Sequence, residues 1–205
     1  MTPLASSLIA FTAAASLLTV TPGLDTALVL RAAAVEGPRR ALLAGLGICL
    51  GCLAWGAVVA FGLGILLQAS RLAYTMLKWA GAAYLVWLGI QLLRAKRDAV
   101  AGPAEGPRGN MLARGFLTNA LNPKVGIFYV SFLPLFVPAG TNVTAVTLLL
   151  ASIHAALGLA WFAALVAATR PLARALARPS MVRALDRATG TIFLLFAARL
   201  ALGRD

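Results

Sequence analysis

Charged residues are scarce in this chain of 205 residues, and acidic ones are scarcer still. Asp, Glu, Lys and Arg together make up 12% of the sequence, only six residues are acidic, and 61% are hydrophobic. Soluble domains carry about 25% charged residues. The composition therefore excludes an ordinary soluble domain and favours a protein whose main solvent is the lipid bilayer.

The residue types that build catalytic and metal sites are also scarce. His154 is the single histidine, and the two cysteines, Cys49 and Cys52, fall in one hydrophobic run. With no Ser-His-Asp set, phosphate-binding glycine loop or cluster of metal ligands, we expect no enzyme, no cofactor and no resident metal. We interpret the cysteines as small residues that let helices pack closely, and we expect the nearby Gly47-x-x-x-Gly51 pattern to serve packing within the molecule.

Basic residues are absent from the first 30 positions, although the net charge is +12. A secretory signal begins with basic residues, so we expect the first hydrophobic run to be retained as a membrane span. Segments 31–40, 94–114 and 169–187 hold three, five and five of the 18 lysines and arginines. Such clusters mark cytoplasmic loops. They predict that both termini lie outside, and they argue against nucleic-acid binding.

Six hydrophobic runs approach the roughly 20 residues that a membrane-spanning helix needs. They cover residues 4–30, 41–67, 72–93, 115–137, 143–168 and 187–203. We therefore predict an all-α integral membrane protein with six transmembrane helices and one transporter domain. It would consist of a first three-helix half (1–93), a cytoplasmic linker (94–114) and a second three-helix half (115–205).

The two halves share a weak internal similarity. Lys78-x-x-Gly81 aligns with Arg187-x-x-Gly190, and an aromatic residue follows three positions after each glycine. Because each half has an odd number of spans, duplication would place the halves in opposite orientations. The sequence thus predicts two inverted three-helix repeats.

Each half opens with a hydrophobic run that a proline interrupts. The interruptions read Thr21-Pro22-Gly23-Leu24-Asp25 and Asn119-Ala120-Leu121-Asn122-Pro123-Lys124. Proline suits the first position of a helix behind a capping Thr or Asn, so we predict that Thr21 and Asn122 cap new helices inside the membrane. Helix N-termini bind carboxylates, and paired broken helices form substrate sites in secondary transporters.

One ionisable residue accompanies each interruption. Asp25 is the only acid within the six runs, and Lys124 lies about nine residues into its span. A lysine at that depth costs about 3 kcal/mol on insertion scales and needs an anion, either Asp25 or a substrate carboxylate, unless it snorkels to the interface. For Asp25 four roles stay open: binding a substrate ammonium, carrying a coupling proton, stabilising its own helix N-terminus, and pairing with Arg31.

The predicted site combines both interruptions. The substrate-binding candidates are Thr21, Pro22, Gly23, Asp25, Asn119, Asn122, Pro123 and Lys124. The proton-coupling candidates are Asp25 and, more weakly, His154, which has Trp161 two turns later on the same helical face. The alternative for His154 is a structural hydrogen bond to a neighbouring helix.

These motifs resemble the LysE/RhtB family of amino-acid exporters. The resemblance rests on Thr21-Pro22-Gly23-x-Asp25, Gly45-Leu46-Gly47, Lys78-x-x-Gly81-x-x-Tyr84-Leu85, Gly115-Phe116-Leu117-x-Asn119-x-x-Asn122-Pro123-Lys124 and Phe132-Leu133-Pro134-x-Phe136. It extends from about residue 10 to residue 200. Two positions depart from the family pattern: Leu24 stands where a second proline is usual, and Trp55 stands where a histidine is often found.

The resemblance implies a multi-pass exporter in the bacterial inner membrane that moves amino acids or close derivatives by proton antiport. Its partners would be the small-molecule substrate and the lipid bilayer, with a homodimer as the candidate assembly. Two alternatives come from the residues. A metal-ion exporter of similar topology would need several intramembrane carboxylates or thiolates, and a membrane thiol or reductant carrier would need cysteines at both interruptions.

Overall fold

The computed structural model describes residues 2–69, 109–168 and 178–202, with scattered residues between 76 and 94. Regular structure in these parts is helical, which confirms the all-α prediction. The elements are α1 (Pro3–Val20), α2 (Leu24–Val35), α3 (Pro38–Ala69), α5 (Met111–Ala120), α6 (Pro123–Phe132), the short 3-10 helix η1 (Leu133–Phe136), α7 (Val143–Ala167) and α9 (Pro179–Leu202). The third predicted span, 72–93, lies mostly outside the described residues.

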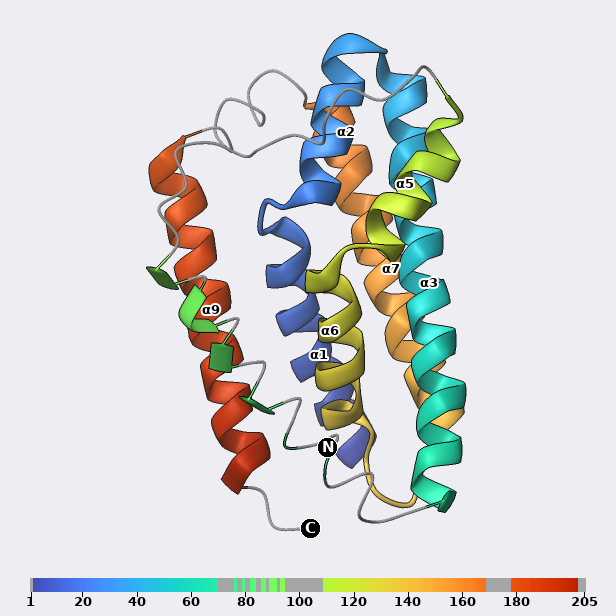
Figure 1. Ribbon diagram of the computed structural model, residues 1–205, viewed down its shortest axis with the longest axis vertical. Helices are drawn as coiled ribbons and strands as arrows, with labels where there is room; N and C mark the ends of the chain where they lie inside the picture. The colour runs from blue at the N-terminus through green and yellow to red at the C-terminus, as the bar shows by residue number, and fades with distance from the viewer. Residues whose placement is uncertain are drawn as a thin grey trace.

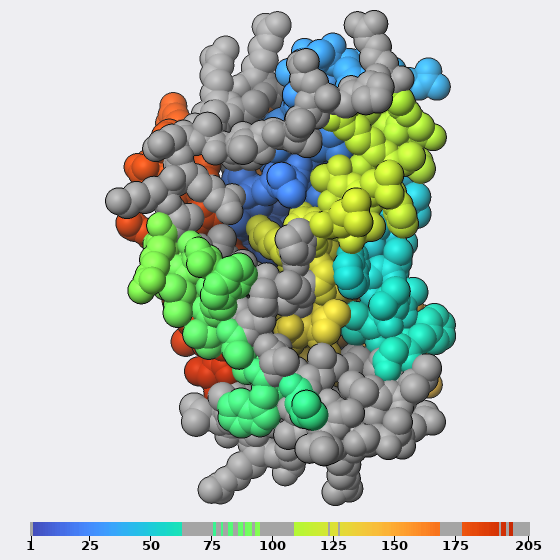
Figure 2. Space-filling view, in the orientation of Figure 1, coloured from blue at the N-terminus to red at the C-terminus, as the bar shows by residue number. Residues whose placement is uncertain are grey.

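Three described helices are long and apolar enough to cross a membrane: Pro3–Val20, Pro38–Gly62 and Val143–Ala167. The outer face of α3 is apolar, with Val58 and Phe61 more than 60% exposed, and Figure 2 shows α3 along the right-hand edge of the molecule. Apolar surface of this kind is matched by lipid rather than water. The chain is therefore an integral membrane protein.

Close helix packing around α3 depends on glycine. A Cβ on Gly47 would run into the backbone of Leu112 on α5, and a Cβ on Gly115 would run into the backbone of Ala44 on α3. Gly51 similarly leaves room for the side chain of Asn119. The prediction that Gly47 and Gly51 serve internal packing is confirmed, and α5 is held against α3 at backbone contact.

The first predicted span is two helices, as expected, but the break differs from the prediction. Thr21 does not cap the second helix; it ends α1, and its hydroxyl donates to the Leu17 carbonyl oxygen at 2.7 Å. Pro22 is therefore not the first residue of a helix. Helix α2 begins at Leu24, with Gly23 in an extended conformation (φ −151°) as its N-cap.

The second break agrees with the prediction. Helix α5 ends at Ala120, and α6 begins at Pro123 behind Asn122. The Asn122 Oδ1 atom accepts a hydrogen bond from the Lys124 backbone N–H at 3.0 Å. Both breaks lie near the mid-height of the molecule, with α1 and α6 below them and α2 and α5 above them (Figure 1). Two helix N-termini therefore begin at a similar depth.

The helix ends that border the basic segments of the sequence lie at one end of the molecule. The turn between α2 and α3, the start of α5, the end of α7 and the start of α9 gather at one end of the molecule, whereas α1 starts and α9 ends at the opposite end (Figure 1). Arg40 donates to the Gly109 carbonyl oxygen at 2.8 Å, which joins two of the basic segments. Helix α9 starts at Pro179, eight residues before the predicted span at 187; the prediction began later because Arg183 and Asp186 interrupt the apolar run.

Candidate functional site

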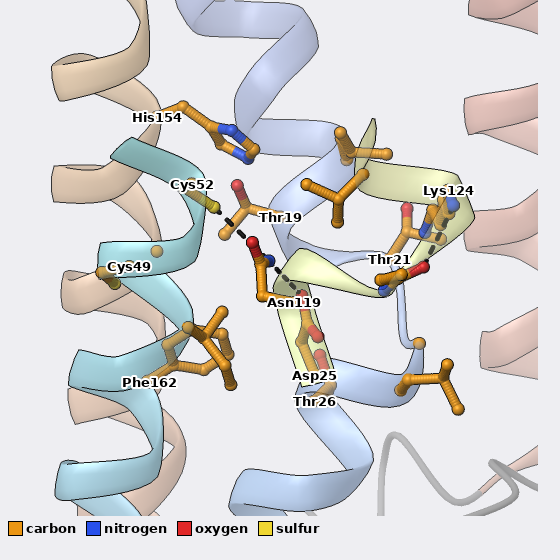
Figure 3. A pocket seen from close by; sticks show the side chains of 17 residues that line it. Thr19, Thr21, Asp25, Thr26, Cys49, Cys52, Asn119, Lys124, His154 and Phe162 are labelled. Carbon is orange, nitrogen blue, oxygen red and sulfur yellow. Dashed lines mark hydrogen bonds between the residues drawn. The ribbon is translucent and has the colours of Figure 1, made fainter. Parts of the chain in front are cut away.

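A cavity lies where the two breaks meet, and 17 residues from α1, α2, α3, α5, α6, α7 and the breaks themselves line it. Six of the eight predicted substrate-binding residues are among them: Thr21, Gly23, Asp25, Asn119, Asn122 and Lys124. His154 lines it as well. Pro22 does not line it, and the side chain of Pro123 lies outside the described residues. The structure thus brings together polar residues that are about 100 positions apart in the sequence (Figure 3).

Asn119 joins the two breaks. Its Nδ2 atom donates to Asp25 Oδ2 at 2.8 Å and also lies 3.5 Å from Cys52 Sγ on α3. The residue is buried, with 1% of its surface exposed. The other carboxylate oxygen of Asp25, Oδ1, accepts no hydrogen bond from the part of the chain that the structure describes. A buried acceptor without a donor is costly, so Asp25 is suited to receive a donor from a ligand.

Lys124 extends toward the first break. A Cβ atom on Gly23 would lie 3.8 Å from the Lys124 Nζ atom, so the ammonium of the second break lies beside the N-cap of α2. Asp25 is in the first turn of α2, where the helix dipole favours a negative charge. The cavity therefore combines one carboxylate, one ammonium and two helix N-termini, a set that complements the carboxylate and ammonium of an amino acid.

His154 lines the cavity from α7 and is hydrogen-bonded through Nδ1 to the Tyr129 hydroxyl of α6 at 3.0 Å. The Phe128 ring packs against the imidazole with a centroid separation of 5.4 Å. The bond to a neighbouring helix that the sequence offered as the alternative role of His154 is present. Tyr129, which the sequence analysis did not single out, fixes the orientation of the ring.

Helix α9 reaches the first break. The hydroxyls of Thr21 and Thr189 are hydrogen-bonded at 2.6 Å, and both residues are buried. Because the Thr21 hydroxyl donates to Leu17, its oxygen accepts from Thr189. Asp186 lies one turn earlier on α9 and is 1% exposed. The sequence analysis missed Asp186 because the sixth predicted span began one residue after it.

The apolar wall of the cavity was also missed. It comprises Ile48, Cys49 and Cys52 on α3 and Gly158 and Phe162 on α7. On α7 the residues at positions 154, 158 and 162 are four apart and share one face, so this stripe was readable once His154 was placed. Trp161, which the sequence analysis paired with His154, does not line the cavity.

Metal ligands do not converge in the part of the chain that the structure describes. No group of three or more His, Cys, Asp or Glu side chains comes together there. Both cysteines are buried free thiols, one turn apart on the same helix. The metal-ion and thiol-carrier alternatives therefore gain no support from the geometry.

Comparison with known proteins agrees with the resemblance seen in the motifs. The model of the LysE type translocator family matches residues 16–204. The chain is 30% identical to the homoserine/homoserine lactone efflux protein of Salmonella typhimurium over 197 residues, which covers 95% of this chain and 96% of that protein. It is 31% identical over 191 residues to the leucine efflux protein of an Enterobacter strain, covering 88% of both chains.

A further relative is an uncharacterized membrane protein of Bacillus subtilis, YrhP, at 28% identity over 207 residues, covering 96% of this chain and 99% of the relative. No solved structure shows a match. The family model covers nearly the whole chain, and the helices long enough to cross a membrane fit a translocator. The chain belongs to the LysE type translocator family and is a membrane transporter, not an enzyme.

Proposed function

We propose that this protein is a secondary active exporter that moves amino acids or close derivatives out of the cytoplasm in exchange for protons. Relatives that match most of the chain are named efflux proteins for homoserine and its lactone and for leucine. The observation that carries the proposal is the cavity between the two breaks, which presents an ammonium and a carboxylate within a largely apolar protein.

In this proposal the substrate carboxylate binds at the positive side of the cavity. Lys124 and the N-termini of α2 and α6 supply the charge and the N–H groups. Gly23 lies beside this position, since a Cβ atom built on it would be 3.8 Å from the Lys124 Nζ atom, an ordinary van der Waals distance. Asn122 and Pro123 define where α6 starts, and Thr21 and Pro22 define where α1 ends.

The substrate ammonium binds at Asp25, which Asn119 orients through the 2.8 Å hydrogen bond. A proton and an ammonium compete for the same carboxylate, so Asp25 can hold one or the other. This mutual exclusion is a simple physical basis for antiport. His154 is the weaker coupling candidate because its Nδ1 is already bonded to Tyr129.

The proposal extends to the whole chain. The chain would form one transporter domain of six membrane spans, with two inverted three-helix halves, 1–93 and 115–205, and a cytoplasmic linker over 94–114. It spans the plasma membrane of a bacterium, with both termini outside and an amino acid as its small-molecule partner. A homodimer is the proposed assembly.

Transport in inside-out vesicles tests this proposal. Vesicles that contain the protein are acidified inside, and accumulation of a panel of labelled amino acids is followed with and without a protonophore. We expect a subset to accumulate, and we expect both Asp25→Asn and Lys124→Ala to abolish accumulation. Arg39→Ala is the matched charge control, because Arg39 is exposed and outside the cavity, and it retains transport.

A second measurement separates substrate binding from proton coupling. In counterflow, labelled substrate exchanges for unlabelled substrate without a proton gradient. If Asp25 binds the substrate ammonium, Asp25→Asn loses counterflow as well as accumulation. Accumulation that persists in folded Lys124→Ala protein, or the absence of any amino-acid transport by the wild type, contradicts the proposal.

A further inference from the structure

We propose that the apolar wall of the cavity is a side-chain subsite that selects uncharged aliphatic side chains, and that Gly158 and Phe162 set the longest side chain that fits. This inference rests on the proposed function and specifies its substrate class. It assigns a role to residues of α3 and α7 that carry none of the charge in the site.

Both charged residues of the cavity lining belong to the breaks. The breaks supply Asp25, Asn119 and Lys124, whereas α3 and α7 supply Ile48, two cysteines, Gly158 and Phe162. Figure 3 shows Phe162 and Cys49 on one side of the cavity and Lys124 on the opposite side, with Asp25 and Asn119 between them. A zwitterion held at the breaks therefore directs its side chain toward α3 and α7.

The part of the cavity lining that α3 and α7 supply has no Asp, Glu, Lys or Arg side chain among the described residues. Among the lining residues of α3 and α7, apart from the two thiols, the only titratable side chain is that of His154, and it is hydrogen-bonded to the Tyr129 hydroxyl. A lysine or glutamate side chain placed here would lose its hydration without gaining a partner of opposite charge, which is strongly unfavourable. The wall thus rejects charged side chains while it accepts apolar ones.

Phe162 is a firmly packed end of the subsite. A Cβ on Gly45 of α3 would lie 3.0 Å from the Phe162 Cβ and 3.2 Å from its Cδ2. The aromatic residue therefore packs directly on the backbone of α3 at Gly45, where a Cβ would make an unusually tight contact. Phe162 itself is 5% exposed, so its ring does not move aside at low cost when a longer substrate enters.

Gly158 is one turn before Phe162 and leaves a gap that one methyl group fills. A Cβ there would meet only Cys49 Sγ at 3.5 Å and Phe162 Cε2 at 3.8 Å, which are ordinary van der Waals distances. Gly158→Ala therefore adds volume at the cavity wall without a clash. The two positions offer opposite changes: Gly158→Ala shortens the subsite, and Phe162→Leu lengthens it.

A homologous series of amino acids tests the inference. Alanine, 2-aminobutyrate, norvaline and norleucine, which differ by one methylene each, compete with a labelled exported amino acid in the vesicle assay. For the wild type we expect competition to strengthen about fourfold per methylene until the side chain reaches Phe162, and then to fall. Lysine and glutamate do not compete.

In Gly158→Ala we expect the best competitor to be one methylene shorter, with at least a tenfold loss for the best wild-type competitor. In Phe162→Leu we expect the optimum to move to a longer chain. Gly62→Ala is the matched control, since a Cβ at Gly62 of α3 meets nothing within 4 Å and the residue is outside the cavity. This control keeps the wild-type optimum.

The outcomes are distinguishable. If the wild type exports no amino acid, the proposed function fails. If it exports amino acids but both cavity variants keep the wild-type chain-length optimum, or lysine competes as well as norvaline, the subsite is overturned. Continued export of the shortest substrate by Gly158→Ala shows that this variant is folded, and the opposite shift in Phe162→Leu tests the subsite independently.

Discussion

Asn119 is the residue on which the site depends most directly. Its amide group is buried between the two breaks, contacts Asp25 at 2.8 Å and approaches Cys52 of α3. An amide can donate to a carboxylate and stays neutral at every physiological pH. It therefore orients Asp25 without adding a charge to the membrane interior.

Replacing Asn119 by leucine removes that donor and keeps a side chain branched at the same carbon. Hydrogen bonds to charged groups contribute about 1.5–3 kcal/mol, so we expect transport at limiting substrate to fall by about 10- to 100-fold. The measurement is the initial rate in vesicles across a substrate range. Thr144→Val is the control, because it removes a hydrogen bond between α7 and the Ala60 carbonyl oxygen of α3 away from the cavity. Equal rates in Asn119→Leu and Thr144→Val would contradict this role.

A second prediction at the residue scale tests whether His154 or Asp25 carries the coupling proton. Glutamine at position 154 keeps a hydrogen-bonding side chain for Tyr129 but cannot carry a proton at physiological pH. Because the His154 Nδ1 is already committed to Tyr129, we expect His154→Gln to retain proton-driven accumulation within about threefold of the wild type. Loss of the protonophore-sensitive component in this variant would instead make His154 the coupling residue.

The residues of the site were predictable to different degrees. Asp25, Asn119 and Lys124 could be predicted because polar side chains stand out in apolar runs. Phe162 could be inferred only from its spacing to His154, once His154 is known to line the cavity, since every span is apolar and hydrophobicity alone does not say which side chain faces a cavity.

At the scale of elements, α3 organises the molecule through its glycines. Helix α5 lies on it at Gly47, and Gly115 of α5 lies against Ala44 in return. Within a membrane, association depends on close packing rather than on a difference in hydrophobicity. The alignment of α5 on α3 is what positions Asn119 opposite Gly51 and next to Asp25.

The glycine contacts between α3 and α5 can be tested by their effect on the melting temperature. Gly47→Ala and Gly115→Ala both place a methyl group against backbone atoms that cannot rotate away. Overpacking of this kind costs about 1–3 kcal/mol or more, so we expect a lower melting temperature in detergent for both variants. Gly62→Ala makes the same chemical change in open space and is expected to melt at or slightly above the wild-type temperature. Identical melting of all three proteins would contradict the packing argument.

The two breaks illustrate what local sequence can and cannot specify. Helix α6 begins at Pro123 as predicted, because the Asn122 side chain caps it by accepting a hydrogen bond from the Lys124 N–H. Thr21 has a competing option: its hydroxyl bonds the carbonyl of the preceding turn at 2.7 Å, as threonine often does in helices. Capping therefore passes to Gly23, and α2 starts two residues later than predicted.

At the scale of the whole molecule, the polar ends and the apolar middle agree with the charge pattern. The described ends of the basic segments gather on one side, and α1 starts and α9 ends on the other (Figure 1). The six hydrophobic runs gave the all-α class correctly. The number of spans and the inverted relation of the halves stay predictions, since the third run lies mostly outside the described residues.

Sidedness is testable with fusions at the C-terminus. Because basic loops remain in the cytoplasm, we expect alkaline phosphatase fused after Asp205 to be active and a cytoplasm-dependent fluorescent protein at the same place to be dark. The matched control carries the reporters within the linker 94–114, where the activities are reversed. Phosphatase activity in the linker fusion and not at the C-terminus would invert the topology.

The hydrogen bond between Thr21 and Thr189 has a consequence for the synthesis of the chain. The two residues are 168 positions apart, and ribosomes add about 5–20 residues per second, so Thr189 is made about 8 to 34 seconds after Thr21. Throughout that interval the Thr21 hydroxyl already has the Leu17 carbonyl oxygen of its own helix as an acceptor. The nascent first span can thus enter lipid with the Thr21 hydroxyl donor already satisfied. When α9 is made, the Thr189 hydroxyl can donate to the Thr21 hydroxyl oxygen, which still has room to accept a hydrogen bond.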